Sequence, residues 1–315
     1  MNDLEGIVSL GTTDIRIPPM GTGAWSWGDR FFWGYGQDYG QEQAHEAFHA
    51  SIASGLNFFD TAEIYGSGRS EQNLGLFIQE TEQPVIVATK FFPFPWRIWR
   101  GSLLSALASS LKRLKLEKVD LYQIHNPHPW FLQNTFLDDL AEAARRGMTR
   151  AVGVSNYNRD QTHHAQEILS REGIPLASNQ VEYSLLNRKI ERDGTLQACR
   201  ETGAAVIAYS PLGMGMLTGK YTPASPPSGL RRWKYRRSFL EKLQPLIELL
   251  REIGQDGQGR TPAQVSLNWV ICKGCVPIPG AKNARQAREN AGALGWQLNP
   301  DEIAALDEAS DKVQA

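Results

Sequence analysis

The sequence predicts an α/β fold in which eight parallel strands, each followed by a helix, close into a (β/α)8 TIM barrel with an N-terminal β-hairpin and extra helices. Short apolar runs alternate with longer segments of helical periodicity, which is typical of a parallel sheet covered on both faces. Eight such units fit into the 315 residues, as a barrel requires. The G-x-G-x-x-G pattern that typically follows the first strand of an open, doubly wound sheet is absent. We therefore expect one domain over residues 1–315.

The expected strands are short apolar runs, and several of them end in a polar residue. They are residues 20–25, 57–60, 84–90, 119–125, 149–155, 176–182, 203–210 and 275–280. The intervening segments repeat apolar residues every three or four positions. In the segment 102–117, for example, Leu103, Leu107, Leu111 and Leu114 follow this spacing, which predicts a helix with one buried face.

Three segments do not belong to the repeat. Residues 5–19 predict an N-terminal hairpin around a Gly-Thr-Thr-Asp turn. Residues 217–237 form a long loop rich in Pro, Ser and Arg after the seventh strand. A loop of this length in a compact domain is usually a lid or a binding loop, and its cations lead us to expect a lid over an anionic ligand. Residues 238–254 predict an extra helix.

Composition excludes several classes of function. The formal net charge is −1, so no basic excess favours nucleic acid or an anionic membrane surface. Three cysteines are too few for a disulfide scaffold. The N-terminus lacks the pattern of a signal peptide, and no apolar run is long enough to span a bilayer. We expect a cytoplasmic protein with a small-molecule partner, and a monomer by default.

Four polar side chains are expected to converge at one end of the barrel. Asp60, Lys90 and His125 each stand at the C-terminal end of a predicted strand. In a barrel of this kind these ends share one face, where active sites are built. Tyr65 follows Asp60 by one short, glycine-rich loop and therefore lies on the same face.

This set of groups suits the reduction of a carbonyl. A phenol with a pKa of about 10 is a weak proton donor at neutral pH, and a neighbouring ammonium is expected to lower that pKa. A carboxylate keeps the lysine charged, and a neutral imidazole donates a hydrogen bond that orients the carbonyl oxygen. The missing hydride must come from a cofactor.

A series of motifs resembles the aldo-keto reductase superfamily. In family order they are GTGAW, FFDTAEIYGSGRSEQNLG, ATK, DLYQIHNP, GVSNY, NQVEYSLL, AYSPLGMGMLTGKY, TPAQVSLNWV and IPGAKNARQARENAGAL, within residues 21–294. The resemblance implies that Tyr65 is the proton donor, that Asp60 and Lys90 tune it, and that His125 orients the substrate. The segment IPGAKN is similar to the branch that includes potassium-channel β subunits and bacterial and plant reductases.

The resemblance also implies NADPH/NADP⁺ as the cofactor. The implied contacts are Ala24, Trp25, Asp60, Ser155, Asn156, Gln180, Tyr209, Ser210, Pro211, Leu212, Gly213, Met214, Gly215, Lys220, Arg231, Gly280, Lys282, Gln286, Glu289 and Asn290. Many family members place an arginine where this chain has Gln286. Lys282, with Arg231 or Arg232, is expected to supply that charge to the 2′-phosphate.

Two motifs suggest metal or redox chemistry. His45 and His49 match H-E-x-x-H, and Glu71 is a candidate third zinc ligand. The pattern fixes only three positions and falls on the first barrel helix, so we interpret it as a partly solvated helix face. Cys272 and Cys275 form C-x-x-C, but zinc would need another pair, so we interpret them as small buried residues. We expect no metal site.

Aromatic residues crowd the loops of the active face. They are Trp25, Trp27, Phe31, Phe32, Trp33, Tyr35, Phe91, Phe92, Phe94, Trp96 and Trp130. Some must pack the loops together, and the rest predict an apolar pocket wall that favours aromatic or bulky carbonyl compounds.

The sequence also distinguishes a reductase from two other function classes. A cofactor-binding regulatory subunit, like the channel β subunits, would replace the histidine, whereas this chain keeps His125. A barrel hydrolase with a metal would need His and Asp ligands at the strand ends. An enzyme that reduces carbonyl groups is therefore favoured.

Overall fold

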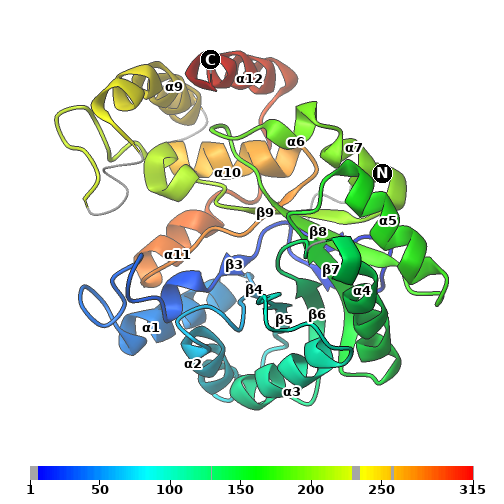
Figure 1. The fold of residues 1–315 in the computed structure, drawn as a ribbon. Helices are drawn as coiled ribbons and strands as arrows, with labels where there is room; N and C mark the ends of the chain where they lie inside the picture. Colours follow the sequence, from blue (N-terminus) through cyan, green and yellow to red (C-terminus); the bar gives the residue numbers. More distant parts are fainter. Residues whose placement is uncertain (1–5, 129, 229–234, 257–258, 315) are drawn as a thin grey trace.

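The computed structural model describes residues 6–128, 130–228, 235–256 and 259–314. At its centre lies a sheet of eight parallel strands in the order β10-β9-β8-β7-β6-β5-β4-β3 (Figure 1). The strands are β3 (Thr22–Gly23), β4 (Phe58–Asp60), β5 (Ile86–Phe91), β6 (Val119–Ile124), β7 (Thr149–Ser155), β8 (Leu176–Glu182), β9 (Ala205–Tyr209) and β10 (Val276–Pro277). Each corresponds to one of the eight predicted strands.

The sheet closes on itself between its first and last strands. The backbone N–H of Gly21 donates to the carbonyl of Pro277 at 3.0 Å, and that of Gly23 donates to Pro279 at 3.0 Å. Gly23 also forms a parallel bridge with Gly280. A Cβ at Gly23 would stand 2.8 Å from the carbonyl oxygen of Ile278, so this close approach requires glycine. The predicted (β/α)8 barrel is confirmed.

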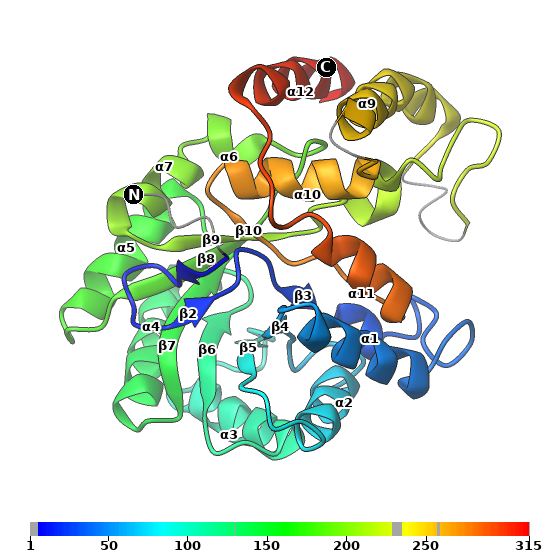
Figure 2. The ribbon, with the colours of Figure 1, turned by 180° about the vertical axis from the view of Figure 1, so that it is seen from behind.

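Helices form a ring around the sheet in both views (Figures 1 and 2). They are α1 (Gln41–Ala53), α2 (Arg69–Ile78), α3 (Ser102–Leu114), α4 (Trp130–Arg145), α5 (Arg159–Ser170), α6 (Lys189–Arg192), α7 (Thr195–Thr202), α9 (Arg237–Asp256), α10 (Pro262–Cys272), α11 (Ala284–Ala291) and α12 (Pro300–Gln314), with short 3₁₀ helices η1 (Trp25–Trp27) and η2 (Gly213–Thr218). Several starts are set by local sequence. Thr261 and Gln264, for example, form a capping box ahead of Pro262.

The N-terminal hairpin covers the end of the barrel at which the strands begin, which is the end seen in Figure 2. Strands β1 (Val8–Ser9) and β2 (Arg16–Ile17) pair antiparallel, which confirms the predicted hairpin. Leu10, Ile15 and Ile17 are buried in one apolar cluster with residues of the barrel strands such as Phe58 and Leu121. Because this end is filled, the C-terminal ends of the strands remain as the open face.

The expected element boundaries shift by a few residues for identifiable reasons. The helix predicted over 102–117 ends at Leu114, because Lys115 takes the left-handed conformation (φ 56°). The first strand is shorter than residues 20–25 because the chain enters η1 at Trp25. Of the expected lid over 217–237, residues 229–234 lie outside the described residues. Within the described part of the chain, no helix is long and apolar enough to cross a membrane.

Candidate active site

The four predicted catalytic side chains meet at the open face of the barrel. Asp60 ends β4, Lys90 lies near the end of β5, and His125 directly follows β6. Lys90 Nζ lies 2.5 Å from Asp60 Oδ1 and 3.3 Å from the hydroxyl of Tyr65. The rings of Tyr65 and His125 meet edge to face, with centroids 5.6 Å apart. The four side chains therefore meet at one face, as the sequence spacing predicted.

The Asp60–Lys90 ion pair is buried and fully supported by hydrogen bonds. Lys90 Nζ also donates to the carbonyl of Thr61 at 2.8 Å. Asp60 Oδ2 accepts from Gln180 Nε2 at 2.8 Å and from Gln123 Nε2 at 3.4 Å. Burial alone would lower the pKa of Lys90, but the attraction of Asp60, with Tyr65, raises it above its ordinary value. The lysine therefore stays charged, as expected.

The pKa of Tyr65 differs from the sequence-based expectation. Burial raises it above its ordinary value, and the nearby charge of Lys90 lowers it only in part. The expectation that lysine would lower the pKa of this phenol below normal is therefore wrong for the protein alone. The physical reason is that Lys90 already shares its charge with Asp60, so it cannot compensate for the desolvation of a phenolate. The phenol stays protonated.

His125 is held neutral. Burial, and then the charge of Lys90, lower its pKa to about 3. Its Nδ1 atom is buried with no hydrogen-bond partner among the described residues. An unpaired lone pair is less costly than an unpaired N–H donor, so the favoured tautomer carries its proton on Nε2. That N–H is then available as a donor to a ligand in the cavity that His125 lines.

A cavity of about 890 Å³ extends from these residues to the first turn of α11. Among the predicted catalytic and cofactor residues it is lined by Trp25, Asp60, Tyr65, His125, Ser155, Asn156, Gln180, Tyr209, Ser210, Pro211, Leu212, Met214, Gly215, Lys220, Gly280, Lys282, Gln286, Glu289 and Asn290.

Of the predicted cofactor residues that the structure describes, two are not among the lining residues. Ala24 is buried, and its N–H donates to the carbonyl of Asp60 at 2.8 Å, so it shapes the strand end. Gly213 has φ +55°, and a Cβ there would meet Leu186 Cδ1 at 2.6 Å, so it forms the turn after β9. Arg231, like its neighbour Arg232, lies outside the described residues.

Polar side chains next to the catalytic residues are fixed by one another. Asn156 has a left-handed backbone (φ 62°) directly after β7, a conformation that asparagine tolerates better than most residues. Its Nδ2 donates to the carbonyl of His125 at 3.1 Å and to Asn126 Oδ1 at 2.9 Å. The hydroxyl of Tyr209 donates to Asn156 Oδ1 at 3.0 Å. Together with Ser155 and Gln180 they offer donors and acceptors that suit a carboxamide.

Three cationic side chains, together with that of Glu289, are among the lining residues of the cavity. The cationic side chains are those of Lys220, Lys282 and Arg285. The Gln286 side chain accepts from the backbone N–H of Lys282 at 2.8 Å, while Asn283 caps α11 by accepting from Gln286 N–H at 3.0 Å. Gln286 therefore orders the start of the helix, which gives this departure from the family pattern a structural role.

Sequence reasoning missed several lining residues. Arg285 stands one position before Gln286, and the available signal was a cation in the first turn of a helix whose N-terminus favours anions. Ile64 and Asn126 also line the cavity, and each neighbours a predicted catalytic residue in the sequence.

Some of the aromatic residues line the cavity, and others pack the loops or are exposed. Trp25, Trp33 and Phe92 line the cavity, whereas Phe31 is 95% exposed and Trp96 is 64% exposed. Other rings pack loops, since Phe32 stacks on Trp25, Phe94 stacks on Trp96 and Trp27 is buried. The side chain of Trp130 is outside the described part of the structure.

Glu71 cannot join His45 and His49, because its buried carboxylate accepts from Thr89 Oγ1 and Arg113 Nε, each at 2.6 Å. The thiols of Cys199, Cys272 and Cys275 are free.

Burial also argues against a redox role for the C-x-x-C motif. It raises the pKa of Cys275 to about 12, which disfavours a reactive thiolate.

A barrel with a buried Asp–Lys pair, a protonated phenol and a neutral imidazole beside an elongated cavity defines a carbonyl-reducing oxidoreductase. The sequence profile of the Aldo/keto reductase family matches residues 19–311. The chain belongs to this family, and with it to the NADP-dependent oxidoreductases.

Similar proteins include one curated relative and two solved structures. A chloroplastic pyridoxal reductase of Arabidopsis thaliana is 42% identical over 309 residues, covering 94% of this chain and 84% of the relative. The structure of a glycerol dehydrogenase from Gluconobacter oxydans is 26% identical with a TM-score of 0.85, covering 99% of this chain and 97% of its own. An aldo-keto reductase of Klebsiella pneumoniae in complex with NADPH is 27% identical with a TM-score of 0.74, covering 96% and 94%.

Proposed function

We propose that the protein reduces aldehydes and ketones to alcohols with NADPH, and that its preferred substrates are aromatic or bulky apolar carbonyl compounds. The observation that carries this proposal is the aromatic wall beside the proton donor. Trp25 stacks on the ring of Tyr65 with centroids 5.9 Å apart, and Phe92 meets the ring of His125 at 5.5 Å. A flat apolar substrate between these rings gains contact area that a small polyol cannot use.

The residues present fit the cofactor. The polar groups of Ser155, Asn156 and Gln180 suit a nicotinamide carboxamide beside the catalytic residues, and Lys220 and Lys282 suit the phosphates farther along the same cavity. When bound, NADPH supplies the hydride.

The chain supplies the proton and the alignment. The neutral His125 donates a hydrogen bond to the substrate oxygen, and Tyr65 transfers its hydroxyl proton to that oxygen as negative charge develops on it. Lys90, 3.3 Å from the phenol oxygen, then stabilises the phenolate that remains.

The similarity to a pyridoxal reductase supports the aromatic preference, because pyridoxal is an aromatic aldehyde. We therefore include pyridoxal among the substrates to be tested, and we place the enzyme in a reducing compartment such as the cytoplasm, which its three free thiols support.

A matched substrate panel tests the proposal. The oxidation of NADPH is followed with pyridoxal, a substituted benzaldehyde and glyceraldehyde, for the wild type and for the variants Phe92→Ala and Phe31→Ala. We expect higher kcat/KM for the aromatic aldehydes, a loss of about tenfold or more in Phe92→Ala, and no loss in Phe31→Ala, since Phe31 is 95% exposed. Equal kcat/KM for glyceraldehyde and the aromatic aldehydes would contradict the preference.

A further inference from the structure

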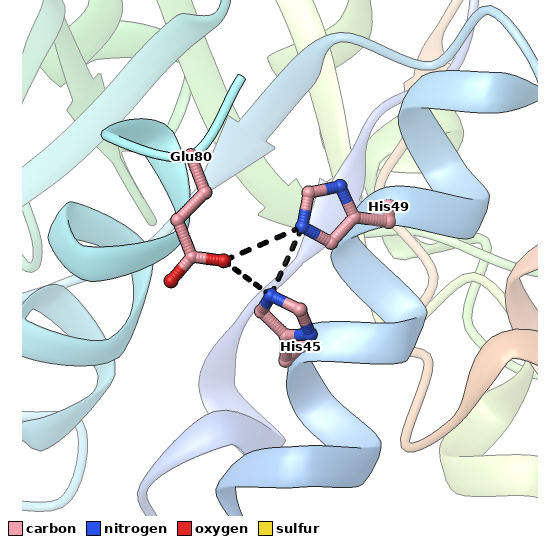
Figure 3. A group of neighbouring side chains, drawn as sticks. All are labelled: His45, His49 and Glu80. Atoms are coloured by element: carbon pink, nitrogen blue, oxygen red, sulfur yellow. Dashed lines mark hydrogen bonds and ion pairs between the residues drawn. The ribbon is translucent and has the colours of Figure 1, made fainter.

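Three potential metal-ligating side chains face one another on the outside of the barrel, away from the catalytic residues. His45 and His49 stand one turn apart on α1, and Glu80 lies in the turn that directly follows α2 (Figure 3). Nε2 of His45 lies 2.5 Å from Glu80 Oε2 and 3.0 Å from Nε2 of His49, and the latter lies 3.8 Å from Glu80 Oε2. None of the three residues lines the large cavity.

An ordinary surface ion pair explains only part of this arrangement. His45 and Glu80 alone would form one, and such pairs contribute little to stability. His49 adds a second imidazole nitrogen aimed at the same point, although its side chain is 39% exposed and has access to water. The three ligand atoms, two imidazole nitrogens and one carboxylate oxygen, all lie within 4.8 Å of one another and therefore face a common point.

The two imidazole rings are held by buried aromatic neighbours. The ring of His45 packs edge-on against Phe77, with centroids 5.2 Å apart, and the ring of His49 packs edge-on against Phe48 at the same distance. Phe77 and Phe48 are both buried. The ligand atoms are therefore oriented in advance, which reduces the entropy lost when an ion binds.

We propose that His45, His49 and Glu80 bind one divalent transition-metal ion of the zinc type, with water in the remaining position. Ligand atoms about 2.0–2.1 Å from a tetrahedral zinc ion stand about 3.3 Å apart. The observed separations of 2.5, 3.0 and 3.8 Å bracket that value, so small side-chain rotations complete the site. Two imidazoles and one carboxylate suit Zn²⁺ or Co²⁺, whereas Mg²⁺ and Ca²⁺ prefer oxygen ligands.

The bound ion would tie the first barrel helix to the end of the second. Between the two helices runs the segment 54–68, which contains β4 and carries Asp60 and Tyr65. The ion therefore stabilises the unit that presents the proton donor, without touching the donor itself. The H-E-x-x-H pattern supplies two ligands, and the third is Glu80 rather than Glu71.

Metal titration of the purified full-length chain tests the proposal. Calorimetry with Zn²⁺ alone is expected to show one ion per chain that Mg²⁺ does not displace. Zinc at about 100 times its Kd should shift the folding equilibrium about 100-fold toward the native state, seen as a rise in the thermal midpoint. Co²⁺ should give the intense visible absorption of a tetrahedral ion.

Matched variants locate the ion. His45→Ala and His49→Ala should each weaken Zn²⁺ binding by about 100-fold or more, and Glu80→Gln by about tenfold. The control is His163→Ala, which removes a surface histidine that pairs with Glu201 at 3.2 Å and should leave binding unchanged. Carbonyl reduction without added metal should be normal in His49→Ala, which shows that this variant is folded.

Three results would overturn the proposal. The first is the absence of a one-to-one Zn²⁺ complex in the wild type. The second is unchanged affinity in His49→Ala and His45→Ala. The third is a loss of binding in Cys272→Ser with full binding in His49→Ala, which would place the ion at the thiols instead.

Discussion

Burial sets the protonation of Tyr65 and His125. It keeps the phenol of Tyr65 protonated and the imidazole of His125 neutral, so a proton donor and a hydrogen-bond donor coexist over a wide range of pH. The charge of Lys90 adds to the effect of burial at His125, where both lower the pKa, and opposes it in part at Tyr65, where burial raises the pKa. The charge of one lysine therefore lowers the pKa of both Tyr65 and His125.

Tyr65→Phe should remove the proton donor alone. We expect kcat for carbonyl reduction to fall about 100- to 10,000-fold, while the Kd of NADPH stays within about twofold, because the phenol oxygen contacts Lys90 rather than the predicted cofactor residues. Stopped-flow turnover and a fluorescence titration with NADPH measure the two quantities. Turnover like that of the wild type would exclude Tyr65 as the donor.

His125 should make the protein less stable in acid. Its pKa is about 3 in the folded state and about 6.5 when unfolded, so between these values the unfolded chain binds a proton that the folded chain does not. The free energy of unfolding therefore rises with pH across this window. The stability that the neutral His125 contributes is lost progressively as the pH falls from 6.5 toward 3.

Denaturant unfolding of His125→Asn across pH 4–6.5 checks this sign. The pH dependence of the variant should be shallower than that of the wild type by about one proton. Identical slopes would mean that His125 is not buried in its neutral form.

Lys282→Ala should discriminate between the two nicotinamide cofactors. A charged hydrogen bond is worth roughly 1.5–3 kcal/mol, or about 10- to 150-fold in Kd, and only NADPH carries the 2′-phosphate. Lys282 Nζ also donates to the carbonyl of Trp33 at 2.6 Å, so some loss common to both cofactors is expected from the loop. The measured quantity is the ratio of the two Kd changes, and a ratio of one would remove Lys282 from phosphate recognition.

At the scale of elements, the loop that carries Tyr65 is fixed by a backbone contact. Gly66 has φ +57°, and a Cβ there would stand 2.2 Å from the carbonyl oxygen of Gly28. Gly66→Ala should therefore lower the free energy of unfolding by roughly 2–4 kcal/mol and reduce kcat by displacing the neighbouring phenol. Chemical denaturation and steady-state kinetics measure both effects.

Gly55→Ala provides the matched control. Gly55 also has positive φ (+81°), but a Cβ there meets nothing within 4 Å. We expect a loss of roughly 1–2 kcal/mol from the backbone conformation alone and an unchanged kcat. If both variants had the same kcat, the contact with Gly28 would not position Tyr65.

The strands, and the convergence of the polar residues at their ends, could be predicted because both follow from periodicity along the chain. Asp60, Lys90 and His125 recur at strand ends, and a parallel barrel brings all strand ends to one face. The contact of Glu80 with His45 could not be predicted, because it depends on how two helices pack. The raised pKa of Tyr65 was also missed, since it depends on how deeply the phenol is buried rather than on which residues surround it.

At the scale of the whole molecule, the cavity spans the closure of the barrel. Trp25 follows the first strand, while Gly280 and Lys282 follow the last, and all three line the cavity. A ligand bound there joins both ends of the sheet and binds only the closed barrel. NADPH at about 100 times its Kd should therefore stabilise the protein by about 2.7 kcal/mol, measured as a higher midpoint of denaturation. An unchanged midpoint would mean that the cofactor also binds the open chain.

The closure of the barrel also has a consequence during synthesis on the ribosome. The hydrogen bond from Trp27 Nε1 to the carbonyl of Ala281 joins residues 254 positions apart. Because synthesis adds about 5–20 residues per second, Ala281 is added roughly 10–50 s after Trp27. During that time the outer edge of β3 has no neighbour, and unpaired edges invite association with other chains. The two-residue length of β3, ending in Gly23, leaves little edge for a foreign strand to join. The short strand at which the barrel closes is therefore also the strand that exposes the least edge while the barrel is incomplete.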